Sequence, residues 1–289
     1  MNSVIASLQT AQATPIPDSS IGRTLLDLGK ITTEDAENIL RAQKSTGTRF
    51  GEAAIALGIV SKADISQALA LQFSYPYLLP GEGNLSPLMV AAYEPFSHQV
   101  EELRAIRSQL MLRWFSMGKS SLTIVGTGKQ EGVSIFAANL AIVFSQLGEN
   151  TILVDANLRS PVQHSLFNMH GKQGLSDILA GRADVNAVQK VSSLANLSLL
   201  SAGTIPPNPQ ELLNRPSFKA TDLNLRNTHD VVIYDTPSLN ASADALAVST
   251  ASGALLIVRK NRSVQREITA AVAKLQRTGC EVVGTILIG

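Results

Sequence analysis

Glycines, a serine and two acidic strand ends supply the residue types of a nucleotide site in this chain of 289 residues. The stretch GTGKQEGVSI sets Gly128, Gly132 and Ser134 between a β-branched segment and a helical one. Glycines let backbone N–H groups approach phosphate oxygens, and a serine hydroxyl can complete the shell of Mg²⁺. Lys129 and Ile135 complete the predicted nucleotide contacts. The stretch therefore predicts a phosphate-binding loop that opens a helix.

Two aspartates each end a predicted strand, Asp155 in ILVDANLR and Asp235 in VVIYDTP. Carboxylates at the ends of neighbouring strands, beside a phosphate loop, can hold Mg²⁺ or orient an attacking oxygen. We therefore assign both aspartates as candidate catalytic residues, and both together with Ser134 as candidate Mg²⁺ ligands. The alternative is that each aspartate caps the helix or turn that follows it.

The elements that must position these residues alternate along the chain. Short β-branched segments are separated by longer helical ones, which is typical of a doubly wound, mostly parallel α/β sheet with helices on both faces. The expected strands span residues 121–125, 151–155, 197–200, 231–235, 254–258 and 281–287. Ligands of such sheets bind at the carboxyl ends of the strands, where the loop and the aspartates fall.

A repeat precedes this region. SIGRTLLDLGKITTEDAENILRAQ, which begins at Ser20, aligns with RFGEAAIALGIVSKADISQALALQ, which begins at Arg49. Each copy predicts two helices joined at a Gly-containing turn, with Thr32 or Thr33 and Ser61 as N-caps. Both copies share two glycines and a final glutamine, at Gly22, Gly29 and Gln43 and at Gly51, Gly58 and Gln72.

These patterns predict four regions. Residues 1–19 form a flexible N-terminus, residues 20–78 a small helical domain, residues 79–100 a linker, and residues 101–289 the α/β domain. The linker follows from PYLLPGEGNLSP, which holds three prolines and two glycines.

Composition narrows the function classes. The 24 Lys and Arg against 23 Asp and Glu give a net charge of +1, which argues against nucleic acid as a ligand. The single cysteine, Cys280, cannot form an internal disulfide. No apolar segment is long enough for a signal peptide or a membrane span. We expect a cytoplasmic protein whose membrane contact comes through a partner.

From about residue 101 to residue 288 the chain resembles bacterial tyrosine kinases of the exopolysaccharide chain-length type, which have a MinD-like P-loop fold. The resemblance rests on GKQEGVS, ILVDANLR, the strand ending at Asp235, and TIPPNPQELL. EELRAIR matches a family segment that mediates ring-like self-association, which implies that role for Glu101, Arg104 and Arg107. The order of the regions is similar to the EpsG-type component of exopolysaccharide operons.

This resemblance implies an ATP- and Mg²⁺-dependent protein-tyrosine kinase that works at the inner membrane with a chain-length determinant or co-polymerase. The departures are Val133, where the family has its loop lysine, Gln130 for a glycine, and Asn157 for a second carboxylate. No tyrosine follows Tyr234 in this sequence, so we do not expect the C-terminal tyrosine cluster that the family uses. We therefore expect either a weak kinase or a non-catalytic nucleotide-binding regulator. A MinD-like positioning ATPase is a third reading.

The repeat resembles the MshEN type of domain, some members of which bind cyclic di-GMP. That resemblance implies a second ligand site at the shared glycines and glutamines, with Arg49 pairing a guanine edge or phosphate. In the first copy Ser20 stands where the arginine should be. The alternatives are that the glycines are turn residues of a helical bundle, and that the bundle docks a protein.

Overall fold

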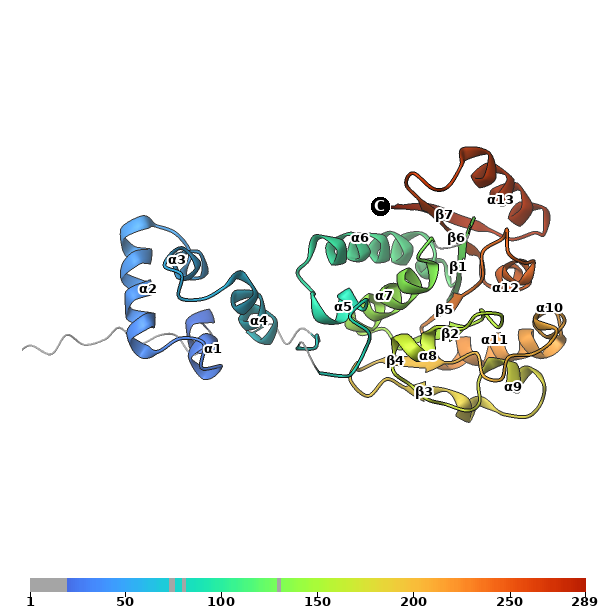
Figure 1. Ribbon diagram of the computed structural model, residues 1–289, viewed down its shortest axis with the longest axis horizontal. Helices are drawn as coiled ribbons and strands as arrows, with labels where there is room; N and C mark the ends of the chain where they lie inside the picture. Colours follow the sequence, from blue (N-terminus) through green and yellow to red (C-terminus); the bar gives the residue numbers. More distant parts are fainter. Residues whose placement is uncertain (1–19, 73–75, 80–81, 129–130) are drawn as a thin grey trace, which may run out of the picture. The chain divides into compact units, whose positions relative to one another are not determined.

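The computed structural model describes residues 20–72, 76–79, 82–128 and 131–289. They fall into two compact units that divide between residues 75 and 76. Figure 1 shows a unit built of helices and a unit built around a sheet. The expected N-terminus at 1–19 and the loop residues Lys129 and Gln130 lie outside the described residues.

The described part of the first unit has four helices around a small apolar core that includes Leu25, Ile39 and Ala68. The helices are α1 (Ile21–Asp27), α2 (Thr33–Thr46), α3 (Phe50–Ala56) and α4 (Lys62–Gln72).

The start of the second helix in each copy uses the same pair of contacts. Thr32 Oγ1 accepts a hydrogen bond from the Asp35 N–H at 3.2 Å, and the Asp35 carboxylate accepts one from the Thr32 N–H at 2.9 Å. Ser61 and Asp64 form the equivalent bonds at 3.2 and 3.0 Å. These reciprocal contacts satisfy N–H groups that a helix start leaves unpaired. The predicted caps at Thr32 and Ser61 are confirmed.

The second unit contains a sheet in the order β3-β4-β2-β5-β1-β6-β7, parallel except for β3. All six predicted strands are present, and the fold class is confirmed. The antiparallel β3 was not predicted. The strands are β1 (Ser121–Gly126), β2 (Thr151–Asp155), β3 (Gln189–Lys190), β4 (Leu197–Leu200), β5 (Val231–Asp235), β6 (Ala254–Arg259) and β7 (Val282–Ile288).

Helices cover both faces of this sheet (Figure 1). One face carries α5 (Val90–Tyr93), α6 (His98–Arg113), α7 (Val133–Gln146) and α8 (Gln163–Leu166). The other carries α9 (Leu175–Leu179), α10 (Pro209–Leu213), α11 (Pro216–Thr228), α12 (Asp244–Ser252) and α13 (Gln265–Arg277). Single 3₁₀ turns lie at Phe115–Met117 and Val185–Ala187. Among the helices described, none is long and apolar enough to cross a membrane.

The segment expected as a linker, residues 79–100, contributes to the core of the second unit. Leu85, Met89 and Ala92 are buried in the cluster that α7 also joins. Asn139 on α7 accepts a hydrogen bond from the Ala91 N–H at 2.9 Å. The described part of this segment therefore helps to hold α7, the helix that begins at the phosphate loop.

Candidate functional site

The two predicted catalytic aspartates lie side by side where β2 and β5 end. Asp155 and Asp235 are paired in the parallel register of these strands, and both residues are fully buried. Burial is the largest cause that raises the pKa of each carboxyl, and the charge of Asp235 raises the pKa of Asp155 further. Both acids thus lie at the carboxyl ends of two neighbouring parallel strands.

Asp155 also organises the segment that follows it. Its carboxylate accepts hydrogen bonds from the backbone N–H groups of Asn157, Val162 and Gln163 at 3.2, 3.1 and 3.0 Å. The last two groups lie at the start of α8. Asp155 therefore has the capping role considered as an alternative, and this role is compatible with its place beside Asp235.

Gln163 is a site residue that the sequence reasoning missed. Its Nε2 donates to Asp235 Oδ2 at 2.7 Å and to the Ser134 carbonyl oxygen at 3.0 Å. The residue is fully buried, and its Oε1 has no hydrogen-bond partner among the described atoms. An amide in this position neutralises no charge, but it satisfies one carboxylate oxygen. The available signal was a polar residue eight positions after Asp155, shortly beyond the ILVDANLR motif.

Ser134, Asp155 and Asp235 form a donor set whose chemistry fits Mg²⁺. Burial raises the pKa of Asp235, and the side chains of Gln163 and then Ser134 partly offset that rise, which places the Ser134 side chain toward Asp235. Asp235 Oδ1 is buried without a hydrogen-bond partner among the described atoms, and a cation would satisfy it. Mg²⁺ commonly binds one or two carboxylates with waters and substrate oxygens. The described residues contain no group of three Asp, Glu, His or Cys side chains that could hold a metal.

The described part of the phosphate loop is folded against its own side chains. Gly132 has φ of 75°, in the left-handed region that favours glycine, and caps the start of α7. A Cβ on Gly126 would lie 2.7 Å from both Glu131 Oε2 and Val133 Cγ2, so this glycine is required by close approach. A Cβ on Gly128 would lie 3.5 Å from Glu131 Oε1, which is an ordinary contact distance. Val133, the position at which the resemblance implies a lysine, is buried in the core cluster.

Glu131 is the second site residue that the sequence reasoning missed. It is only 3% exposed although it lies on a loop. Its Oε1 accepts hydrogen bonds from Thr127 Oγ1 and from Ser263 Oγ, the latter at 2.5 Å. Its Oε2 is buried and has no hydrogen-bond partner in the part of the chain described. A buried carboxylate therefore lies inside the loop expected to receive phosphate.

A cavity of about 880 Å³ opens beside the loop, between α6, the start of α7 and the end of β7. Glu131, Gly132 and Ile135 line it from the loop side, and Arg259 lines it from the end of β6. Ile135, one of the predicted nucleotide contacts, thus faces a space large enough for a small ligand.

Two further residues of the DANLR motif, Arg159 and Asn157, connect the motif to a neighbouring helix and shape its turn. Arg159 donates to both carboxylate oxygens of the buried Asp244, with Nε at 2.7 Å and Nη2 at 3.1 Å. This contact raises the pKa of Arg159 and joins the motif to α12. Asn157 accepts a hydrogen bond from the Ser160 N–H at 3.2 Å, so it shapes the turn.

The three residues assigned to self-association lie on α6. Glu101 and Arg104 form an ion pair within the helix, in which the Glu101 side chain is 60% exposed and Arg104 only 16%. Arg107 Nη1 donates to the Val143 carbonyl oxygen of α7 at 2.8 Å. Arg107 therefore has a contact inside the unit. In the pair of Glu101 and Arg104, the Glu101 side chain is the more accessible one.

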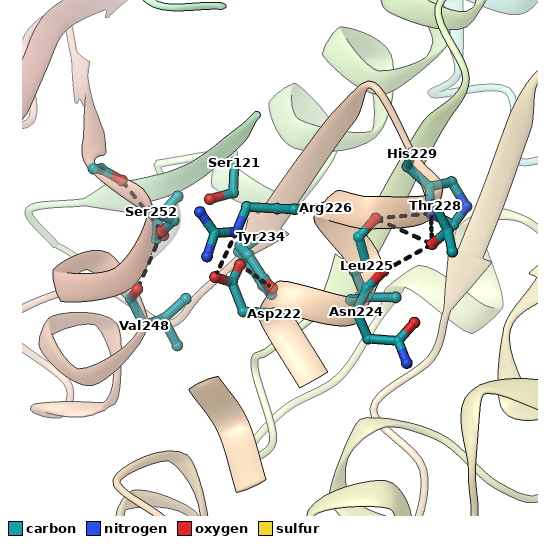
Figure 2. A network of polar contacts seen from close by, with 12 residues as sticks. Ser121, Asp222, Asn224, Leu225, Arg226, Thr228, His229, Tyr234, Val248 and Ser252 are labelled. Atoms are coloured by element: carbon teal, nitrogen blue, oxygen red, sulfur yellow. Dashed lines mark hydrogen bonds and ion pairs between the residues drawn. The ribbon is translucent and has the colours of Figure 1, made fainter. Parts of the chain in front are cut away.

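The side chain of Tyr234, on β5, is part of the core between the sheet and α11. Its hydroxyl donates to Asp222 Oδ1 at 2.8 Å, and Arg226 pairs with the same carboxyl at 3.0 Å (Figure 2). Burial, followed by the charge of Asp222, holds the pKa of the Tyr234 phenol well above its usual value. The residue is fully buried, as its position in a predicted core strand implied.

In the first unit, one glycine of each copy permits close packing of helices. A Cβ on Gly22 would lie 3.1 Å from the ring of Phe50, and a Cβ on Gly51 would lie 3.2 Å from Ile65. Both positions are helical, so the missing side chain lets a neighbour pack against the helix.

The other shared positions belong to turns and exposed ends. Gly29 and Gly58 have φ of 65° and 69°, and they follow α1 and α3. The carbonyl of Gln43 accepts a hydrogen bond from the N–H of Gly47, the residue that follows α2. Arg49 and Gln72 are exposed. The structural roles of the four glycines therefore match the bundle reading of the repeat.

Known proteins similar to this chain are bacterial kinases. A putative tyrosine-protein kinase, CapB from Staphylococcus aureus, is 30% identical over 207 residues, which is 71% of this chain and 90% of CapB. The solved kinase domain of the Escherichia coli tyrosine kinase ETK is 30% identical, with a TM-score of 0.67 over 70% of this chain and 79% of that one.

Similarity in fold extends further than similarity in sequence. The septum site-determining protein MinD from Pyrococcus horikoshii, solved with Mg-ADP, has 19% identity and a TM-score of 0.52 over 58% of this chain and 70% of that one. This likeness concerns the fold alone. No protein-family profile matches the chain.

Proposed function

The chain belongs to the bacterial tyrosine kinase family, and from this premise we propose that it is a kinase-fold regulator of exopolysaccharide chain length or export that transfers phosphate weakly or not at all. The observation that carries the proposal is the loop itself. Val133 is buried where relatives have a lysine, and the buried carboxylate of Glu131 lies inside the loop. A loop with a negative charge and no lysine at that position stabilises transferring phosphate poorly.

Nucleotide binding without efficient turnover is compatible with the rest of the site. Ser134, Asp155 and Asp235 would hold Mg²⁺, which when bound would offset negative charge on phosphate oxygens. Asp155 keeps the following turn in place through its three backbone contacts, and Gln163 holds Asp235 in its orientation. We propose ATP or ADP with Mg²⁺ as the ligand.

Restoring the lysine tests this proposal. We expect wild-type protein to show little or no ATP turnover, and Val133→Lys to bind Mg-ATP at least about tenfold more tightly, because a cation would then face the phosphates. Val133→Met is the matched control, since methionine has similar length without charge. Calorimetry measures binding, and phosphate release measures turnover. Efficient wild-type turnover that Asp235→Asn abolishes would show that the chain is an active kinase or ATPase.

The partner in this proposal is a membrane-embedded chain-length determinant or co-polymerase, which would hold the protein at the inner face of the membrane. Calorimetry should be repeated with peptides of that partner's cytoplasmic tails. A tail that supplies a cation could restore nucleotide binding in trans, as external arginines do in other phosphoryl-transfer sites.

Self-association through α6 is a further part of the proposal. Arg107 is unsuitable for the test, because its contact with Val143 would be lost as well. Glu101→Lys reverses an accessible charge, and Glu102→Lys is the matched control because Glu102 is similarly exposed, at 65%. We expect sedimentation to show dissociation only for Glu101→Lys. Equal oligomerisation of both variants would argue against this surface.

The first unit is proposed as a docking module of the same assembly. Its four shared glycines have packing or turn roles, which supports a bundle over a dinucleotide site. Cyclic di-GMP binding is tested directly by calorimetry with the wild-type protein and Arg49→Ala. Binding that depends on Arg49 would favour the nucleotide role.

A further inference from the structure

We propose that the hydroxyls of Thr127 and Ser263 form an anion subsite that Glu131 fills as an internal ligand, so that phosphate groups bind there only by displacing the Glu131 carboxylate. The inference rests on the proposed function in one respect, which is that this loop receives phosphate groups. It holds whether or not the protein transfers them.

Two hydroxyls from distant parts of the chain converge on one carboxylate oxygen. Thr127 follows β1, and Ser263 lies between β6 and α13. Both donate to Glu131 Oε1, and the two hydroxyl oxygens are 3.4 Å apart. Ser263 Oγ also accepts the Arg259 N–H at 2.9 Å, which orients its proton toward Glu131. Such converging donors are what a bound oxyanion requires.

The resident carboxylate satisfies this subsite incompletely. Glu131 Oε2 is buried beside Gly126 and accepts no hydrogen bond from the described atoms. A buried charged oxygen without a donor is unfavourable. A ligand that brings its own cation, or additional oxygens able to reach other donors, would compete with this arrangement.

The surroundings leave room for the exchange. Glu131 and Gly132 line the cavity of about 880 Å³ together with Arg259. The Glu131 side chain can therefore move into an existing space, and Arg259 brings a positive charge to the same wall. Glu102 on α6 lines the same cavity, and its Oε1 lies 3.6 Å from Nδ1 of His98 on the same helix.

Inorganic pyrophosphate with Mg²⁺ is the probe, measured by calorimetry on the full chain. We expect Glu131→Ala to bind it about tenfold more tightly than wild type, or more. Glu102→Ala is the matched control, because it removes an equal charge from the same cavity and should leave the affinity unchanged. In the Glu131→Ala background, Thr127→Val and Ser263→Ala should each reverse the gain.

Glu131→Gln provides a second test if the alanine variant folds poorly, since it keeps the shape of the side chain and removes the charge. Unchanged pyrophosphate affinity in the folded Glu131 variants would overturn the proposal, as would a gain that survives loss of both hydroxyls. An equal gain in Glu102→Ala would reduce the effect to general electrostatics and also overturn it. Efficient turnover by wild type would contradict the proposed function and leave this comparison of affinities valid.

Discussion

Gln163 Nε2 lies 2.7 Å from Asp235 Oδ2, so a neutral amide is the direct partner of the buried acid at the end of β5. The same nitrogen holds the Ser134 carbonyl at 3.0 Å. One side chain thus joins two of the three segments from which a metal would be bound.

Replacing Gln163 with methionine should destabilise the second unit by about 2 kcal/mol, because Asp235 would lose a buried donor while the volume is kept. Urea unfolding followed by fluorescence of Trp114, the single tryptophan, measures the change. Gln173→Met is the control, since Gln173 is exposed. Equal stability of both variants would mean that the amide contributes little.

Arg159→Ala should cost about 2 to 3 kcal/mol, because it leaves the buried Asp244 carboxylate without its partner. We expect a loss near 2 kcal/mol, because the Arg159 side chain is 44% exposed and water therefore weakens the ion pair. Arg159→Lys should lose less, since an ammonium can form one of the two bonds. The same fluorescence measurement applies, and an alanine variant as stable as wild type would contradict the prediction.

The first unit should lose stability in acid through Asp64. Lys30, at 2.8 Å, and then the hydrogen bonds from Ser61 lower the pKa of Asp64 to about 2 from 3.8. A pKa that is lower in the folded state means that this contribution is complete above about pH 4 and is lost as the pH falls toward 2.

Asp64→Asn should therefore remove roughly 1 kcal/mol at pH 6, a value reduced for solvent screening, and almost nothing near pH 2. NMR signals of residues 21–72 during urea unfolding measure it. Asp27→Asn is the control, because the Asp27 side chain is 63% exposed. A difference between Asp64→Asn and wild type that does not change with pH would contradict the assignment.

Tyr234→Phe should destabilise the second unit by about 1 kcal/mol, because Asp222 loses the hydroxyl that donates to it. A double-mutant cycle with Asp222→Asn isolates the contact. Independent effects of the two changes would mean that the hydrogen bond adds little. Because the ring is buried, we expect no phosphorylation of Tyr234 in the folded protein, which mass spectrometry can check.

The sequence was sufficient for elements that depend on local pattern. The β-branched segments became strands, and strand ends in a parallel sheet brought Asp155 and Asp235 together. The duplicated capping residues Thr32 and Ser61 could likewise be read directly, because a cap is a contact between residues three positions apart.

Contacts between distant segments could not be read in this way. The burial of Glu131 depends on Ser263, far along the chain, and a glutamate on a loop is ordinarily exposed. The segment rich in proline and glycine near residue 80 has the composition of a linker, yet Leu85 and Met89 pack beneath α7. Proline and glycine indicate that this segment has no regular helix or strand, but they do not indicate whether its apolar side chains pack into a core.

The strand order has a consequence for how the chain is made. Strand β1 pairs only with β5 and β6, which are synthesised roughly 110 to 130 residues later. Until then the apolar helix α7, nearly all of which is buried in the finished unit, has no complete sheet to cover it. The helices of the first unit, α1 and α4 included, contact one another within residues 21–72, so this unit can fold as it leaves the ribosome. Expression yield should therefore depend on chaperones that protect the nascent second unit.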